Sequence, residues 1–222
     1  MNQDQWTEVD RYITDLLVPA DEVLDAALAD SSAAGLPDIN VAPNQGKLLH
    51  LMALMQGARR ILEIGTLGGY STIWLGRALP ADGTLITLEA VEKHAAVARR
   101  NIERAGLAEL VEVKVGPAAE TLAALIEAKT EPFDFIFIDA DKQGYPEYFT
   151  LALKLSRKGT VMVADNVVRQ GAVAHPDSRD ERVQGVRRFN ELVAAEPRVS
   201  ATVVQTVGSK GYDGFAVAVV TE

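Results

Sequence analysis

The sequence predicts an α/β fold, a doubly wound and mostly parallel seven-stranded sheet with a C-terminal antiparallel hairpin and extra N-terminal helices. From residue 60 onward, short apolar segments alternate with helical ones, which is typical of a parallel sheet with helices on both faces. A glycine-rich turn, Gly65–Gly69, joins the first expected strand directly to a helix, as in Rossmann-like folds. The last two strand-like segments lie too close together for a parallel crossover, so we expect them to pair antiparallel.

We expect residues 1–222 to form a single domain, because this length supports one sizeable core. Residues 1–58 are expected to be N-terminal helices, and residues 59–222 the Rossmann-like core. Apolar side chains recur at helical spacing between residues 6 and 17, and Pro19 ends that helix. A second helix is expected from Glu22 to Ala33. A third, which is largely apolar, is expected to be capped by Asn44.

The expected strands are apolar runs bounded by turns, and those that are apolar throughout indicate burial on both faces. They are Arg60–Ile64, Thr84–Glu89, Val111–Val115, Phe133–Asp139, Thr160–Asp165, Val199–Val207 and Gly214–Val220. Helices are expected between them, at about residues 70–79, 91–106, 117–128, 145–156 and 180–195.

Composition and charge exclude several function classes. The formal net charge of −9 argues against a DNA-binding surface, which needs clustered Lys and Arg. The absence of cysteine excludes disulfides, thiolate zinc sites and cysteine nucleophiles. The first residues lack the basic start and apolar core of a signal peptide, and no uncharged apolar run reaches the roughly 18 residues of a membrane span. We therefore expect a cytoplasmic protein with no DNA or membrane partner.

The glycine turn fits a nucleotide-like cofactor without a pyrophosphate. It lacks the second glycine of the dinucleotide fingerprint, and no Gly-Lys-Ser/Thr phosphate loop follows. Glu89 ends the second strand 24 positions after Gly65, where a carboxylate can bind ribose hydroxyls. Glu63 lies inside the first strand and can attract an ammonium group, unless it pairs structurally with an arginine. S-adenosylmethionine, with a ribose, an ammonium and no phosphate, is the expected cofactor.

Three motifs carry a resemblance to a known family: residues 63–71 (EIGTLGGYS), residues 138–142 (IDADK) and residues 164–166 (ADN). With these motifs the chain resembles the cation-dependent O-methyltransferases, the family of catechol and caffeoyl-CoA O-methyltransferases, over nearly its whole length. The resemblance implies the methyltransferase fold and a homodimer. It also implies a set of cofactor-binding residues, namely Val41, Glu63, Gly65, Ser71, Glu89, Ala118 and Asp139. Two residues depart from the family pattern, Leu67 where Phe is frequent and Ile39 where Met is frequent, which affects packing around the cofactor.

Asp139, Asp165 and Asn166 are the expected metal ligands. They lie at the ends of two strands that should be neighbours, and ligands that are all oxygens favour Mg²⁺ first, with Mn²⁺ and Ca²⁺ fitting the same donors. On spacing alone, Asp165 and Asn166 could equally cap backbone amides at the start of a loop. The family resemblance favours the metal.

Lys142 and Asp139 are the expected catalytic residues. A divalent cation that holds two adjacent hydroxyls would lower the pKa of one of them, and Lys142 could then take its proton. The alternative for Lys142 is an exposed lysine in a loop. Asp141 could orient Lys142 or a metal-bound water, or cap the helix near Pro146, and Tyr145 could belong to the site or to the core.

Two further assignments concern the surroundings of the site. Residues 167–182 are long and polar, and they are expected either to form part of the acceptor wall or to be a plain surface loop. No catalytic role is expected for the three histidines, His50, His94 and His175, because they have no metal-ligand or triad spacing.

The expected function is Mg²⁺-dependent transfer of a methyl group from S-adenosylmethionine to a hydroxyl of a vicinal dihydroxy aromatic. One alternative keeps the cofactor but methylates another oxygen, such as that of a hydroxylated tRNA base. A second is a non-catalytic cofactor-binding subunit. A nicotinamide-dependent dehydrogenase is the weakest alternative.

Overall fold

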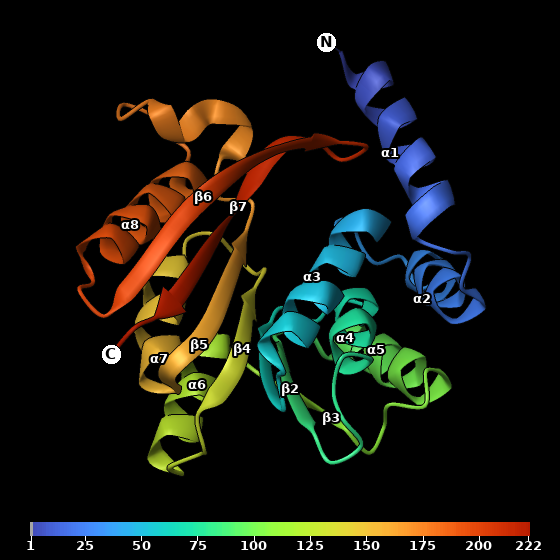
Figure 1. The fold of residues 1–222 in the computed structure, drawn as a ribbon, viewed down its shortest axis with the longest axis horizontal. Coiled ribbons are helices and arrows are strands. Elements are labelled where there is room, and N and C mark those ends of the chain that lie inside the picture. Colours follow the sequence, from blue (N-terminus) through green and yellow to red (C-terminus); the bar gives the residue numbers. More distant parts are fainter. Residues whose placement is uncertain (1) are drawn as a thin grey trace.

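The computed structural model describes residues 2–222, which form one seven-stranded sheet with helices on both faces (Figure 1). The strand order is β3-β2-β1-β4-β5-β7-β6, and β7 alone runs antiparallel to both of its neighbours. The strands are β1 (Arg60–Ile64), β2 (Thr84–Glu89), β3 (Val111–Val115), β4 (Phe133–Ile138), β5 (Ser156–Asp165), β6 (Val199–Gly208) and β7 (Gly211–Val220). The predicted parallel sheet with a closing antiparallel hairpin is confirmed.

The helices cover the sheet in two layers, each with its own apolar core. The helices are α1 (Gln3–Leu17), α2 (Glu22–Ala33), α3 (Pro43–Gln56), α4 (Tyr70–Gly76), α5 (Glu92–Arg104), α6 (Ala118–Glu127), α7 (Tyr145–Lys154) and α8 (Glu181–Ala195). Side chains of α6, α7 and α8 pack together on one face, and those of α2, α3, α4 and α5 pack on the other. Among residues 2–222, no helix is long and apolar enough to cross a membrane.

The sheet reverses its winding between β1 and β4. From β1 the chain proceeds outward to β2 and β3, and it then returns to add β4 and β5 on the other side of β1. The carboxyl ends of β1 and β4 therefore diverge into helices on opposite faces, which opens a crevice at this point. Glu63, Glu89, Asp139 and Asp165 all lie at or near the carboxyl ends of these strands.

The N-terminal helix is anchored to the tip of the β6–β7 hairpin. The buried Asp10 carboxylate accepts hydrogen bonds from the Ser209 backbone N–H (2.7 Å) and from the Asn44 side chain (2.9 Å). A Cβ at Gly208 would lie 2.5 Å from an Asp10 oxygen, so only glycine permits this approach. Segments nearly 200 residues apart in the sequence are thereby joined beside the crevice.

Several sequence predictions need correction at element boundaries. β5 and β7 begin earlier than expected, at Ser156 and Gly211. Asn44 does not cap α3, because Ala42 is the N-cap residue and makes no side-chain cap, and Pro43 opens the helix. The Asn44 amide binds Asp10 instead. β4 ends at Ile138, so Asp139 is the first residue after the strand, which frees its side chain to face the crevice.

Candidate active site

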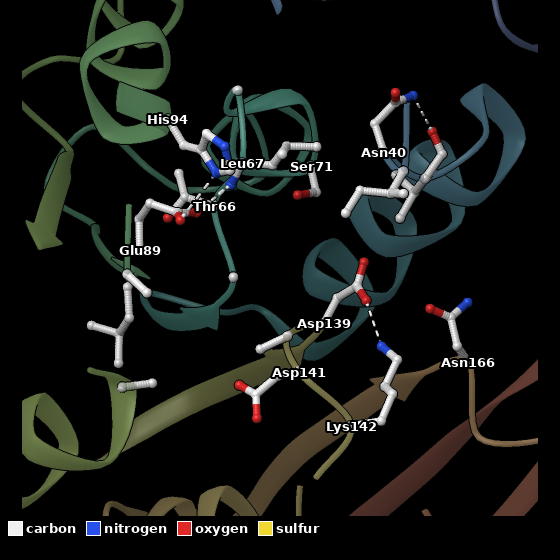
Figure 2. Close-up of a pocket in the computed structure, with 18 of the residues that line it drawn as sticks. Asn40, Thr66, Leu67, Ser71, Glu89, His94, Asp139, Asp141, Lys142 and Asn166 are labelled. Atoms are coloured by element: carbon white, nitrogen blue, oxygen red, sulfur yellow. Dashed lines mark hydrogen bonds and ion pairs between the residues drawn. The ribbon is translucent and has the colours of Figure 1, made fainter. Parts of the chain in front are cut away.

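A cavity of about 770 Å³ opens at the carboxyl ends of β1, β2 and β4 (Figure 2). Its wall contains the glycine turn, the starts of α5 and α6, and the loop after β4. Six of the seven predicted cofactor-binding residues line it: Val41, Gly65, Ser71, Glu89, Ala118 and Asp139. Glu63, the seventh, does not.

The glycine turn is pressed against the end of β4. Gly65 has φ +104°, and a Cβ there would lie 1.9 Å from the backbone oxygen of Asp139. Leu67 also adopts a left-handed conformation (φ 50°), and its backbone N–H donates to Glu89 (2.8 Å). On the far side, the buried Asn101 side chain donates to the Gly68 carbonyl (2.8 Å). The turn is thus fixed by contacts with three other segments of the chain.

Glu89 sits at the rim of the cavity with its carboxylate held on two sides. It accepts the N–H of Leu67 and that of Val91 (3.0 Å), and the His94 ring nitrogen Nδ1 lies 3.3 Å from it. Figure 2 shows His94 beside Glu89, at the end of the cavity away from Lys142. His94 was not assigned to the site from the sequence, although its position in the first turn of α5, five residues after Glu89, is a signal that could have placed it there.

Glu63 is entirely buried below the cavity floor. Its carboxylate accepts hydrogen bonds from the hydroxyls of Ser71 (2.6 Å), Thr72 and Thr87 (2.7 Å). The arginine partner considered from the sequence is wrong, because these hydroxyls satisfy the carboxylate. Burial raises the pKa of the Glu63 carboxyl from 4.5 to about 7, although the three hydroxyl donors oppose this shift. Of the four residues, only Ser71 lines the cavity.

Lys142 is buried beside Asp139, so the alternative of an exposed loop lysine is wrong. Its Nζ lies 2.9 Å from Asp139 Oδ1, a contact drawn in Figure 2. The same Nζ lies 2.5 Å from the Tyr145 hydroxyl oxygen. The Tyr145 oxygen also lies 2.9 Å from the Asp165 carbonyl and 3.1 Å from the Ile138 carbonyl. Tyr145 is fully buried, and this burial holds the pKa of its phenol well above the ordinary value. The neutral phenol therefore joins Lys142 to the ends of β4 and β5.

Asp165 is the last residue of β5, and Asn166 follows it. As predicted, β5 is the neighbour of β4, after which Asp139 comes. Ile138 pairs with Ala164 in the parallel β4–β5 register, so the two aspartates leave the sheet at the same level. Burial, followed by the negative charge of Asp139, raises the pKa of the Asp165 carboxyl to about 7. Asp165 also accepts the N–H of Asn166 (2.8 Å), so the expected loop-start hydrogen bond is present as well.

The donor set fits a hard divalent cation. Lys142, the one buried cation here, pairs with Asp139, and the neighbouring Asp165 has no cation of its own, which leaves a surplus of negative charge. Asn166 adds an amide oxygen, and all three donors are of the kind that Mg²⁺ binds. Within residues 2–222, no three His, Cys, Asp or Glu side chains gather as a metal site, which agrees with a set whose third member is an amide.

Asp141 stabilises the turn before α7. Its carboxylate accepts the Gly144 N–H (3.0 Å) and the Tyr148 hydroxyl (2.5 Å). These contacts match the helix-entry role considered for Asp141. Gly144 itself is the N-cap residue of α7.

A second cavity of about 440 Å³ adjoins the first between α3, the end of β5 and the β6–β7 hairpin. Asp165 lines only the second cavity, whereas Lys142 and Asp139 line only the first. The residues that line both are Ile39, Asn40, Val41, Asn166 and Arg169.

Within residues 167–182, a 3₁₀ helix (Arg169–Ala174) begins where the two cavities meet, and residues 174–177 are exposed. The segment is therefore cavity wall at its start and surface loop farther on.

Comparisons with known proteins agree on one family. A family model described as O-methyltransferase matches residues 19–216. The chain is 54% identical to the catechol O-methyltransferase of Niastella koreensis (99% of this chain and 100% of the relative) and 49% identical to that of Mycobacterium tuberculosis (96% and 95%). Its fold superposes on the crystal structure of a Bacillus cereus O-methyltransferase in complex with SAH, with a TM-score of 0.98 and 60% identity over 99% of this chain and 100% of that one.

The buried Glu63 predicts a specific pH dependence of stability in the ligand-free protein. The folded state holds a proton on Glu63 up to about pH 7, whereas the unfolded chain releases it near pH 4.5. The free energy of unfolding should therefore fall as pH rises between these values, by about 3 kcal/mol for a shift of this size. Glu63→Gln should remove this contribution, measured by urea unfolding at about pH 5, 6, 7 and 8.

Glu109→Gln, at an exposed position, is the matched control and should keep the wild-type slope. Parallel pH profiles for the wild type and Glu63→Gln would contradict the assignment of this slope to Glu63.

Proposed function

The chain belongs to the O-methyltransferase family, and from this premise we propose that it methylates one hydroxyl of a catechol-type aromatic with the help of a bound Mg²⁺. It is an S-adenosylmethionine-dependent enzyme. The observation that carries the proposal is the meeting of the two cavities at Asn166, with Lys142 and Asp139 on one side and Asp165 on the other. The cofactor would fill the larger cavity and the acceptor the smaller one. The family argues against the non-catalytic and nicotinamide alternatives.

S-adenosylmethionine supplies a methyl group on a positively charged sulfonium. In this proposal Glu89 binds the ribose hydroxyls, since its carboxylate is fixed at the rim by two backbone N–H groups. Ser71 binds the amino-acid end, and Glu63 acts through Ser71 because it is itself out of reach of the cavity. Val41, Gly65, Ala118 and Asp139 complete the wall.

Asp139, Asp165 and Asn166 would hold the divalent cation, which when bound lowers the pKa of an acceptor hydroxyl and fixes its position. Mg²⁺ is the first choice, and Mn²⁺ and Ca²⁺ suit the same oxygen donors. The surplus negative charge of the two carboxyl groups supports this assignment, because Asp165 is buried beside Asp139 and the single lysine nearby pairs with Asp139.

Lys142 is the proposed general base. Its Nζ is held by Asp139 and Tyr145, next to the proposed metal ligands. To accept a proton, Nζ must first be uncharged, and a divalent cation bound at Asp139 would favour that form because it repels the ammonium. Direct displacement at the sulfonium methyl then depends mainly on alignment of the two reactants. The rigid ends of β4 and β5 can provide this alignment, because Tyr145 ties them together.

Metal dependence on a catechol acceptor tests the proposed reaction. Chelation with EDTA should abolish methyl transfer, and added Mg²⁺ should restore it. Asp165→Ala should lower kcat/KM by at least about 100-fold, because it removes a ligand from a set of three. Asp177→Ala, in the exposed part of the loop, is the control and should behave like the wild type. Full turnover in EDTA would refute the metal assignment.

Replacement of Lys142 separates chemistry from cofactor binding. Lys142→Met keeps the length of the side chain but cannot accept a proton, so kcat should fall by about 10² to 10⁴. The Kd for S-adenosylmethionine, measured by calorimetry, should change by less than about threefold. Lys154→Met at an exposed position of α7 is the control. Equal losses of kcat and cofactor affinity would indicate a structural role for Lys142 instead.

We also propose a homodimer, supported by exposed apolar side chains on α1 and on α3, which packs against it. The exposed residues are Val9, Tyr12, Leu16 and Leu17 on α1 and Leu51, Leu54 and Met55 on α3. An apolar surface of this kind is typical of an interface between subunits.

Light scattering after gel filtration should give twice the mass of the chain. The double variant Leu16→Asp, Leu54→Asp should give the monomer mass, whereas Lys154→Asp should remain dimeric. A wild-type monomer at micromolar concentration would contradict the dimer.

A further inference from the structure

Arg169 lies where the two cavities meet, three residues after Asn166. Its backbone has φ 54°, and Gln170 has φ 56°, so two successive non-glycine residues adopt the left-handed conformation. The segment is held by Asp213 of β7, whose Oδ1 accepts the backbone N–H of Val168 (3.0 Å) and of Arg169 (2.9 Å). The strained backbone is thus pinned to the sheet, and this arrangement fixes the position of the Arg169 side chain.

The Arg169 guanidinium is largely removed from water but makes no hydrogen bond to the described residues. Its side chain is 23% exposed, and its Nε is buried without a partner. The nearest carboxylate oxygen, Asp213 Oδ2, lies 3.7 Å from Nη1, which is too far for a hydrogen bond. A half-buried guanidinium with unused donors is unfavourable unless a ligand completes it.

Of the other charged residues around the smaller cavity, Asp10, Asp38 and Lys210 already have partners. The Asp10 carboxylate accepts hydrogen bonds from the Ser209 backbone N–H and the Asn44 side chain, and Lys210 Nζ lies 2.7 Å from Asp38 Oδ1. Among the described residues that line this cavity, Arg169 is the cation whose donors remain available. An anionic group of a ligand in this cavity would therefore bind here.

We infer that Arg169 binds a carboxylate on the aromatic acceptor, so that the preferred substrates are catechols with an acidic substituent. This inference rests on the proposed function. The planar fork of arginine matches a carboxylate through two parallel hydrogen bonds. A cavity of about 440 Å³ suits a small aromatic acid.

The position of Arg169 also has a consequence for regiochemistry. A carboxylate held at Arg169 and two hydroxyls held near Asp165 and Asn166 fix the aromatic ring at two points. One of the two hydroxyls then faces the larger cavity, where the methyl donor binds, so one product isomer should predominate.

The cofactor's own carboxylate is the competing ligand, because Arg169 lines the larger cavity too. Binding of the cofactor carboxylate and binding of the acceptor carboxylate lead to different losses of affinity and activity when Arg169 is replaced. If Arg169 bound the cofactor, its removal would weaken S-adenosylmethionine binding and affect all acceptors equally.

The test compares 3,4-dihydroxybenzoate with its neutral analogue, 3,4-dihydroxybenzamide, in the full-length enzyme with Mg²⁺. In Arg169→Gln, kcat/KM for the benzoate should fall about 10- to 100-fold, the range for loss of hydrogen bonds to a charged group. For the benzamide it should change less than about threefold. Arg169→Lys should recover part of the loss, because it restores the charge without the fork. The ratio of meta to para products from the benzoate should approach that from the benzamide.

Arg188→Gln, an exposed position on α8, removes the same charge away from the site and should keep the wild-type preference for the benzoate. Calorimetry with SAH bound should give the same loss of benzoate affinity in Arg169→Gln, with the Kd for S-adenosylmethionine unchanged. Equal effects on both acceptors, or a loss confined to cofactor affinity, would overturn the role of Arg169. Absence of methylation of either acceptor by the wild type would instead overturn the proposed function.

Discussion

The structure depends on two neighbouring carboxyl groups, the buried Asp165 and the partly exposed Asp139, beside one buried cation, Lys142, which pairs with Asp139. Neither carboxylate is stable in such a position without compensation, because burial of like charges is unfavourable. The chain supplies part of that compensation locally. The Tyr145 hydroxyl accepts a hydrogen bond from Lys142 and contacts the backbone carbonyls at the ends of β4 and β5. The lysine, the two aspartates and the strand ends therefore form one unit. The remaining negative charge is what makes this unit suitable for a cation.

The parallel sheet makes this arrangement possible. Because β4 and β5 are adjacent and in register, residues that are 26 positions apart in the sequence emerge side by side. The adjacent β1–α4 turn is equally constrained, since Gly65 touches the Asp139 backbone without room for a Cβ. A shift of that turn would therefore move both the cofactor cavity and Asp139. In the proposed reaction, cofactor binding and metal binding would be coupled through this backbone contact.

Most of the fold could be predicted from the sequence, because apolar periodicity, glycine turns and short connections are local signals. β1, β2 and β3 have the predicted bounds, and the closing hairpin was predicted from the length of its connection. The environments of single polar residues could not be predicted in the same way. Glu63 is satisfied by hydroxyls from two other elements, and Arg169 is held by Asp213 from β7. Asn44, which looks like a helix cap, binds Asp10 from another helix. These contacts depend on tertiary packing, for which single-sequence patterns contain no signal.

The two cavities are built from different parts of the chain, and this separates the tasks of the enzyme. The larger one is formed mainly by the ends of β1, β2 and β4 and the turns that follow them, which are the parts that the parallel sheet fixes. The smaller one is lined at one side by the end of β5, and elsewhere mainly by α3, the segment before it, and the β6–β7 hairpin. Substitutions in the second group can alter the shape and charge of the acceptor site without moving Glu89 or Gly65. Asn166 and Arg169 line both cavities, so the two walls meet at these residues. Acceptor choice can therefore diverge most easily at the helices and hairpin, while the junction is constrained by the reaction itself.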